Sequence, residues 1–244
     1  MEKNTINPKV SLIVGTGNNG YCLELNIRSF MRYNAEYVHE IIIVNNACND
    51  VSVDFMKNNP FKDITSIIAY EDLRNRDAIG PIPKHEHIHL GLNACKTEWA
   101  LLTHVDVMWK TAVVPEFHAI LSANPDLFMT GLGGGDPNSP NAIIHNGTTN
   151  GCRFHEWLLF LNVPEWKRSG YSFAHHTDEK GIWYDNSAWM YKQAYNSGKK
   201  LVPFDTYESH GRHIAHFACG SNIKKQEDSL RAKEILDKEL DIAL

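Results

Sequence analysis

Four short apolar segments, with helical patterns between some of them, constrain the fold of this chain most strongly. The segments are Val10–Val14, Glu40–Val44, Ile64–Tyr70 and Trp99–Thr103. Apolar residues recur at helical spacing over Tyr21–Tyr33, and Glu86–Cys95 has a similar pattern. Runs rich in β-branched residues are typical of buried parallel strands. The alternation therefore predicts an α/β fold with an open, Rossmann-like, mostly parallel central sheet flanked by helices.

After Asp106 the alternation becomes irregular. A glycine-rich stretch, Gly131–Gly135, is followed by a region rich in tryptophan and histidine. Periodicity then predicts a helix over Asn186–Asn196, a strand near Leu201–Phe204 and an amphipathic C-terminal helix. A chain of 244 residues that is 43% hydrophobic can bury a sizeable core. We expect one domain over residues 1–244, with two functional halves.

Composition narrows the range of partners. The formal net charge of −5 provides no overall field that would attract phosphate backbones, although a local basic patch stays open. The five cysteines contain no CxxC pair, and a chain of this length does not need disulfides. No apolar run has the length of a secretory signal or a membrane span. We therefore expect a cytoplasmic protein with reduced thiols and no transmembrane segment.

The segment Gly15–Gly20 matches the pattern GxGxxG between a predicted strand and a predicted helix. This is the setting of a dinucleotide-binding loop, so an NAD-dependent oxidoreductase is one alternative. Such enzymes usually carry an acidic residue at the end of the second strand, whereas here that strand ends in Asn45 and Asn46. Glycines that serve a tight turn would be compatible with any nucleotide site at this edge.

Two potential ligands follow the fourth apolar segment. His104 and Asp106 are two residues apart, so in an extended loop both side chains can face one cation. A carboxylate suits Mn²⁺ or Mg²⁺ on a diphosphate, and imidazole suits Mn²⁺ better than Mg²⁺. A purely structural role for Asp106, as a helix N-cap or as the partner of a basic side chain at a strand end, is an equally weighted interpretation. The pattern indicates a candidate metal site.

Asp185 precedes the helix predicted over Asn186–Asn196. A carboxylate at a helix N-terminus is commonly a cap, because it accepts hydrogen bonds from free backbone N–H groups. The same surroundings keep it ionised. In a cleft, an ionised carboxylate can accept a proton from a hydroxyl, as a general base must.

Six histidines form two clusters. His85, His87 and His89 alternate along one segment, and His210, His213 and His216 follow the last predicted strand. A metal-dependent hydrolase with a zinc site is the alternative that these clusters suggest. Most buried or surface histidines are structural, so we expect only one or two of the six to bind metal.

Taken in order, these segments resemble a family 2-type GT-A glycosyltransferase. Val10–Asn18 resembles the first strand and base-contacting loop of that family, Glu40–Asp50 its second strand, and Gly91–Asp106 its helix, strand and DxD segment. The resemblance covers about residues 8 to 125 and afterwards only Asp185 and His210. Asn45 and Asn46 replace the usual paired aspartates, and His104 replaces the first aspartate of DxD.

The resemblance implies a nucleotide-sugar-dependent, inverting transfer of a sugar to an acceptor hydroxyl. It implies Asp185 as the catalytic base and a Mn²⁺ or Mg²⁺ ion bound by Asp106, His104 and His210. The implied donor-binding residues are Gly15, Thr16, Gly17, Asn18, Asn45, Asn46, Arg74, His104 and Asp106. The nucleotide-sugar half would span about residues 8–107 and the acceptor half about 108–225, followed by a helix over about 226–244.

A UDP-sugar is the first choice of donor under this resemblance. The acceptor expected first is a saccharide, and a modified DNA base, as in some phage enzymes, is the second choice. Basic residues in the acceptor half, among them Arg212, would be needed for a DNA surface. A homo-oligomer stays open, because the terminal helix could pack on this chain or on a second copy.

Overall fold

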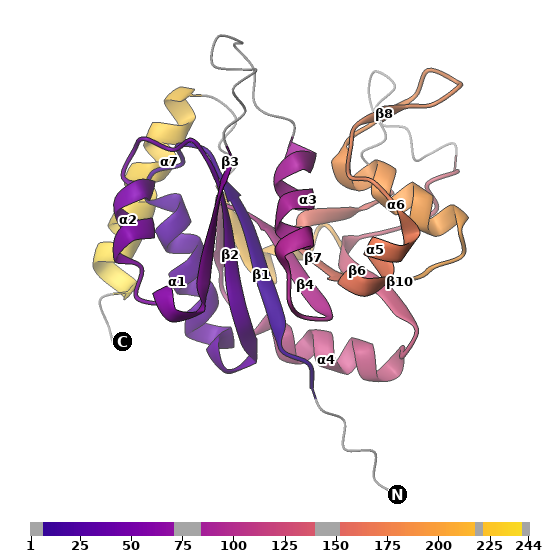
Figure 1. The fold of residues 1–244 in the computed structure, drawn as a ribbon, viewed down its shortest axis with the longest axis horizontal. Helices are drawn as coiled ribbons and strands as arrows, with labels where there is room; N and C mark the ends of the chain where they lie inside the picture. Colours follow the sequence, from indigo (N-terminus) through magenta and orange to yellow (C-terminus); the bar gives the residue numbers. More distant parts are fainter. Residues whose placement is uncertain (1–6, 71–83, 140–151, 218–221, 241–244) are drawn as a thin grey trace, which may run out of the picture.

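The centre of the protein, as seen in a computed structural model, is a seven-stranded sheet (Figure 1). The structure describes residues 7–70, 84–139, 152–217 and 222–240. The strands are β1 (Val10–Thr16), β2 (Val38–Asn46), β3 (Thr65–Tyr70), β4 (Trp99–His104), β6 (Leu127–Gly133), β7 (Phe154–Asn162) and β10 (Lys200–Asp205). Their order is β10-β6-β7-β4-β1-β2-β3, and β7 alone is antiparallel to its neighbours in this sheet of described residues. The predicted mostly parallel α/β fold is confirmed.

Helices cover both faces of this sheet (Figure 1). They are α1 (Cys22–Asn34), α2 (Ser52–Asn58), α3 (Lys84–Ala94), α4 (Val113–Ala123), α5 (Val163–Ser169), α6 (Asn186–Asn196) and α7 (Asn222–Ile235). Shorter helical turns are η1 (Ala35–Tyr37), η2 (Lys62–Ile64), η5 (His210–Arg212) and the π-helical η6 (Leu236–Leu240).

Alternate strand residues enter two separate cores. Leu12 and Ile43 pack with α1, α2 and α4, whereas Ile13 and Ile42 pack with α3, α5 and α6. Because both faces are covered, the central strands read as nearly continuous apolar runs rather than alternating ones. The close fit is visible at Gly91 of α3, where an added Cβ would lie 2.4 Å from Ile13.

Two small antiparallel sheets complete the fold. In the first, β5 (Val107–Trp109) pairs with β11 (Ile214–His216), and in the second, β8 (His176–Thr177) pairs with β9 (Trp183–Tyr184). The first pairing matters for the candidate site. Its register sets His216 opposite Val107, directly after the turn that follows β4.

The C-terminal helix α7 packs against α1 of the same chain. Ala232 of α7 is fully buried in a cluster with Cys22 and Leu25 of α1. No helix among the described residues has both the length and the apolar character that a membrane span requires. The four cysteines within the described ranges, Cys22, Cys48, Cys95 and Cys152, are free thiols.

Candidate active site at the carboxyl ends of the strands

Sheet register brings four of the predicted site residues side by side. β1 lies between β2 and β4, so that Gly15 is opposite His104 and Thr16 is opposite Asn45. Neighbouring strands are about 4.8 Å apart. The carboxyl ends of these parallel strands therefore gather the predicted residues at one edge of the sheet, where ligands bind in open α/β folds.

The loops after β1 and β2 are joined by hydrogen bonds. Asn18 accepts one from the backbone N–H of Asn49 (2.8 Å), and Asn45 accepts one from the N–H of Cys48 (3.0 Å). Asp50 accepts a hydrogen bond from the N–H of Gly20 (2.6 Å). Asn46 lies against Gly17, because its Nδ2 would be 3.5 Å from a Cβ at that glycine. The loops thus form one hydrogen-bonded edge, and the Asp50 carboxylate bonds to the glycine turn.

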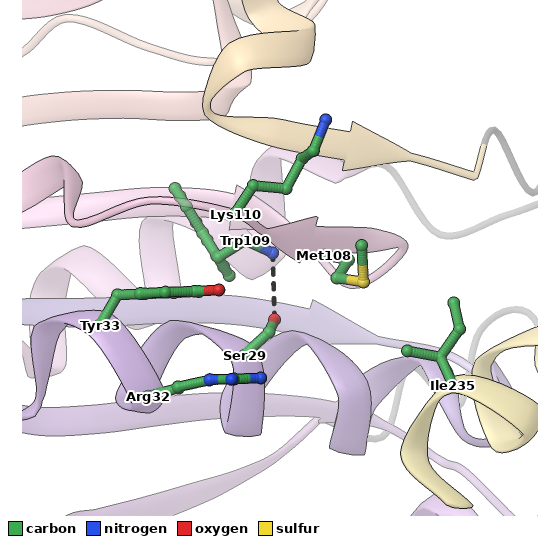
Figure 2. Close-up of a pocket in the computed structure, with 7 residues that line it drawn as sticks. All are labelled: Ser29, Arg32, Tyr33, Met108, Trp109, Lys110 and Ile235. Atoms are coloured by element: carbon green, nitrogen blue, oxygen red, sulfur yellow. Dashed lines mark hydrogen bonds between the residues drawn. The ribbon is translucent and has the colours of Figure 1, made fainter. Parts of the chain in front are cut away.

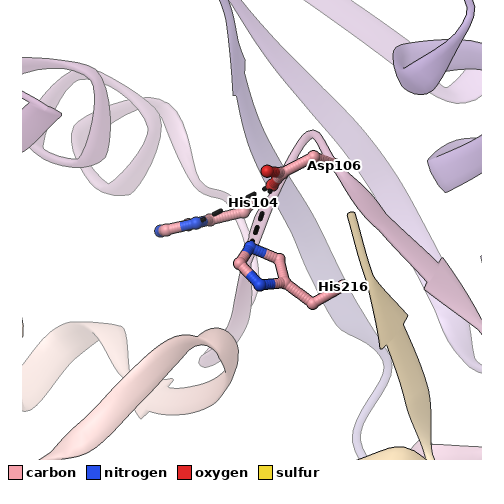
Figure 3. Close-up of side chains that lie close together, drawn as sticks. All are labelled: His104, Asp106 and His216. Atoms are coloured by element: carbon pink, nitrogen blue, oxygen red, sulfur yellow. Dashed lines mark ion pairs between the residues drawn. The ribbon is translucent and has the colours of Figure 1, made fainter. Parts of the chain in front are cut away.

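A cluster of His104, Asp106 and His216 lies next to this edge (Figure 3). His104 ends β4, Asp106 lies in the following turn, and His216 ends β11. Asp106 Oδ1 is 3.9 Å from His104 Nδ1 and 3.4 Å from His216 Nε2. The three side chains offer ligand atoms that all lie within 4.8 Å of one another.

Buried hydrogen bonds hold the turn that carries Asp106. Asn26, fully buried on α1, donates to the backbone carbonyls of His104 and Val107, each at 2.9 Å. The carbonyl of Asp106 accepts from the N–H of Phe217 at 2.9 Å, which ties the turn to the end of β11. The position of Asp106 relative to His216 therefore depends on elements far apart in the sequence.

Three observations show that the cluster fits a divalent cation. Nε2 of His216 is buried and has no hydrogen-bond partner among the described residues, as expected for an atom with a free lone pair. Two imidazoles and one carboxylate form a donor set that suits transition ions such as Mn²⁺ or Zn²⁺ better than Mg²⁺. The separations of 3.4 and 3.9 Å are within the ~4.2 Å that two ligands of one zinc-sized ion can span.

Glu156 of β7 lies on the other side of the His104 ring. Its Oε2 is 3.7 Å from His104 Nε2, and the residue is only 8% exposed. Burial raises the pKa of the Glu156 carboxyl, but its interactions with His104 and with the charge of Arg153 outweigh burial and lower the pKa to about 2. Glu156 is therefore a buried, ionised carboxylate beside the cluster.

Asp185 occupies the N-cap of α6. Its Oδ1 accepts a hydrogen bond from the N–H of Ala188 at 3.1 Å, and its Oδ2 forms an ion pair with Arg153. Burial lowers the pKa of Arg153, while the charge of Glu156 acts in the opposite direction. Arg153 therefore links Asp185 to Glu156 and, through Glu156, to His104.

His210 is not among the ligand atoms that the structure brings together. Its Nδ1 is 2.6 Å from the carbonyl of Tyr207, and its ring lies 5.8 Å from the ring of Trp157. His216, by contrast, does belong to the cluster. Its ring stacks on Trp157 with 4.0 Å between the ring centroids, and its Nε2 points toward Asp106. His213, the third histidine of the group, is buried and bonds to Asp205 at 3.0 Å.

The other histidine cluster lies on α3. His89 Nε2 accepts a hydrogen bond from the N–H of Phe173 at 3.1 Å, and His87 lies near Gly15, where an added Cβ would be 3.1 Å from its Nδ1. The side chain of His85 and all of Arg74 lie outside the described residues. Among the described members, the α3 cluster contributes no ligand atom to the group of His104, Asp106 and His216.

A separate pocket of about 290 Å³ opens between α1, β5 and α7 (Figure 2). It is lined by Ser29, Arg32, Tyr33, Met108, Trp109, Lys110 and Ile235. In Figure 2 the Lys110 ammonium points away from the pocket, in agreement with its hydrogen bond to the carbonyl of Gly211. None of the lining residues belongs to the His104–Asp106–His216 cluster.

Sequence reasoning missed two parts of this site. It named His216 only as one of three histidines, and the spacing could not indicate that β11 would pair with β5. It did not single out Arg153 or Glu156 at all. Their signal was present as charged residues at the start of an apolar segment, Phe154–Asn162, which was not recognised as a strand.

Comparisons with known proteins agree with the fold. No family model and no curated protein matches the sequence. Among solved structures, the chain is similar to the mannosyltransferase PcManGT from Pyrobaculum calidifontis in complex with GDP-Man and Mn²⁺. That match has a TM-score of 0.57 and 15% identity, and it covers 82% of this chain and 55% of the other. TarS 1–349 from S. aureus in complex with UDP is more distant, with a TM-score of 0.48 and 12% identity over 68% of this chain and 50% of that one.

At these identities the likeness shows the fold alone. The chain spans about half the length of the structures it matches. It shares a fold with a solved glycosyltransferase, and this agrees with the fold class predicted from the strand pattern.

Proposed function

We propose that this protein is a metal-dependent glycosyltransferase that moves a sugar from a nucleoside-diphosphate sugar to an acceptor hydroxyl. The observation that carries the proposal is the juxtaposition of His104, Asp106 and His216 with the loops after β1 and β2. One edge of the sheet then offers a cation site beside backbone and amide groups that suit a nucleotide. The shared fold with a glycosyltransferase supports the same reading.

The cation would be held by His104, Asp106 and His216, the last of these in place of His210. Its chemistry there would be to offset the charge that develops on the departing diphosphate. Asp106 would contribute the carboxylate oxygen that both imidazoles face. Asn18, Asn45 and Asn46 lie where the nucleoside would bind, and their amides both donate and accept hydrogen bonds.

Asp185 is the proposed base in an inverting displacement. Its carboxylate accepts the N–H of Ala188 and pairs with Arg153, and these two contacts would hold it in a defined orientation toward an acceptor hydroxyl. The acceptor proton would move to a carboxylate oxygen of Asp185 as the hydroxyl attacks the anomeric carbon.

A saccharide is the proposed acceptor class. Trp183, 37% exposed and two residues from Asp185, is available for stacking on a sugar ring, whereas Trp166 and Tyr184 are buried. Basic residues that a DNA surface would need are partly engaged in ion pairs, since Arg168 and Lys199 both pair with Glu165. Arg212 is 3.6 Å from Asp205. A modified DNA base is therefore the less favoured acceptor.

A metal-dependent hydrolase is the second candidate. The observation in its favour is the donor set itself, because two histidines and one carboxylate also hold zinc in hydrolytic enzymes. A hydrolase of this type needs no nucleotide-binding edge beside its metal, so nucleotide binding separates the two functions.

The first experiment is a calorimetric and thermal-shift panel of UDP, GDP, CDP, dTDP and NAD, each with and without Mn²⁺. Stabilisation by one nucleoside diphosphate only in the presence of Mn²⁺ is expected, because a ligand that binds only the native state raises its apparent stability. The matching nucleotide sugar is then offered with a set of saccharides, and transfer is followed by mass spectrometry. Binding of NAD without metal, or of no nucleotide, would contradict the proposal.

A further inference from the structure

We propose that Glu156 is a positioning residue that keeps the proton of the neutral His104 ring on Nε2 and so leaves Nδ1 free for the cation. This inference rests on the proposed function and extends it to a residue outside the ligand cluster. Glu156 acts through His104 and does not touch the cation.

The two nitrogens of His104 face different carboxylates. Nδ1 is 3.9 Å from Asp106 Oδ1, and Nε2 is 3.7 Å from Glu156 Oε2. Figure 3 shows the second nitrogen of the ring pointing away from Asp106 and His216. Glu156 is accordingly on the far side of the ring and is not part of the cluster whose ligand atoms lie within 4.8 Å of one another.

A neutral imidazole carries one N–H, and each carboxylate can only accept it. With Asp106 as the sole neighbour, the proton would be drawn to Nδ1, which is the atom that must offer its lone pair to a cation. Glu156 supplies a competing acceptor at Nε2. The side chains of Asp106 and Glu156 are both 11% exposed, so water weakens the two attractions to a similar degree.

The backbone keeps Glu156 in place. The hydroxyl of Thr103 donates to the carbonyl of Trp157 at 3.0 Å, which joins the end of β4 to the strand that carries Glu156. The charge of Arg153 offsets part of the cost of burying the Glu156 carboxylate. A carboxylate held in this way can orient an imidazole, as carboxylates next to metal-bound histidines generally do.

The first test is the tautomer of His104, measured by ¹⁵N NMR on metal-free protein with ¹⁵N-labelled histidine. The pH is set to about 8, above the ordinary pKa of histidine. We expect Nε2–H in the wild type and a shift toward Nδ1–H in Glu156→Ala. Glu156→Gln should restore part of the Nε2–H form, because the amide oxygen can still accept that proton. Nδ1–H in the wild type, or no change in Glu156→Ala, would overturn the proposal.

The second test is Mn²⁺ affinity, measured by calorimetry without nucleotide or substrate. Glu156→Ala should bind Mn²⁺ about 10- to 100-fold more weakly, as is typical when a partner of a metal-bound histidine is removed. Glu156→Gln should lose less. Glu40→Gln is the matched control, because Glu40 is also a buried carboxylate, 5% exposed, but lies at the opposite end of the strands and bonds to Ser11.

The outcomes separate this inference from the proposed function. A wild type that binds no Mn²⁺ contradicts the metal site itself, and the tautomer then decides alone whether Glu156 orients the ring. If the wild type binds Mn²⁺ and Glu156→Ala binds it equally tightly, the role of Glu156 is overturned and the metal site stays intact. If Glu156→Ala does not fold, the wild-type tautomer and the Mn²⁺ affinity of Glu156→Gln decide the question.

Discussion

The end of β4 and the start of α6 each carry an aspartate that the sequence singled out, and the two carboxylates have different surroundings. Asp106 faces two imidazoles, one of which has a buried nitrogen without a hydrogen-bond partner among the described residues. Asp185 already accepts a backbone N–H and pairs with Arg153. The first carboxylate lies among side chains that could hold a metal ion, whereas the second faces a cationic side chain of the protein itself. The comparison teaches that the same residue type at a strand end and at a helix end can have different partners, and the different roles that we propose for Asp106 and Asp185 rest on those partners.

Asp106→Ala should have the largest effect on binding, because it removes the carboxylate that both imidazoles face. Mn²⁺-dependent nucleotide binding should weaken by more than about 100-fold, beyond the loss typical of residues that only support a ligand. Calorimetry with and without Mn²⁺ measures it. Asp126→Ala, a change at an exposed aspartate, is the control. Unchanged Mn²⁺ dependence in Asp106→Ala would remove the distinction between the two regions.

Asp185→Asn and Asp185→Ala separate the cap of α6 from the proposed base. Asparagine caps helices as well as aspartate, so Asp185→Asn should keep the cap and lose only the ion pair with Arg153, whereas Asp185→Ala should lose the cap as well, a further cost of about 1 kcal/mol. Both should retain nucleotide binding and lose about 10²- to 10⁴-fold in kcat, which is the usual contribution of a general base. Urea unfolding and single-turnover assays provide the two readouts. Wild-type turnover in Asp185→Asn would leave this residue with a structural role only.

His216→Ala and His210→Ala form a matched pair. His216→Ala should weaken Mn²⁺ binding by at least about 10-fold, because it removes a ligand rather than a supporting contact. His210→Ala should leave the Mn²⁺ affinity unchanged, since His210 bonds to the Tyr207 carbonyl and is not in the cluster. Electron paramagnetic resonance of free Mn²⁺ measures both affinities. The reverse result would restore the ligand set that the family resemblance implied.

Asp178→Asn should have the smallest effect, a loss of stability near α6, because Asp178 also pairs with Lys192 of that helix. Asp178 accepts hydrogen bonds from the N–H of Ile182 (3.0 Å) and the hydroxyl of Tyr184 (3.0 Å). Burial raises the pKa of Asp178, but these bonds outweigh it and hold the pKa below the usual value. The ionised carboxylate therefore stabilises the fold above the ordinary pKa near 4, and this stabilisation is lost as the pH falls through the lowered value.

The expected cost of Asp178→Asn is about 1 kcal/mol at pH 7, the size of one net hydrogen bond. Urea unfolding of both proteins at pH 7 and at about pH 3 measures it, and the difference between them should shrink at the lower pH. A difference that grows on acidification would contradict this account of the Asp178 environment.

Local patterns predicted most of the first half of the fold. The expected strand Trp99–Thr103 is β4 (Trp99–His104), and the expected helix Tyr21–Tyr33 is α1 (Cys22–Asn34). The helix Asn186–Asn196 has the bounds that its periodicity predicted. These elements are readable because a residue's own neighbours decide whether it can be helical or extended and which side of it must be buried.

Long-range pairing explains what the patterns did not reveal. The antiparallel strand β7 lies within a region rich in tryptophan and histidine, where no clear alternation separates a strand from a loop. Its insertion between β4 and β6 brings Glu156 to His104. Nothing in the local sequence around Glu156 indicates that its partner is His104, 52 positions earlier in the chain.

The sequence by itself determined the parallel half of the sheet, the loops at its carboxyl edge and the presence of His104 and Asp106 beside them. Apolar periodicity is a local property, so it can be read from the chain in order. The tertiary structure alone decided that His216 rather than His210 faces Asp106, and that Glu156 and Arg153 lie behind them. Those choices follow from the pairing of β11 with β5 and of β7 with β4, which depends on how the whole chain packs.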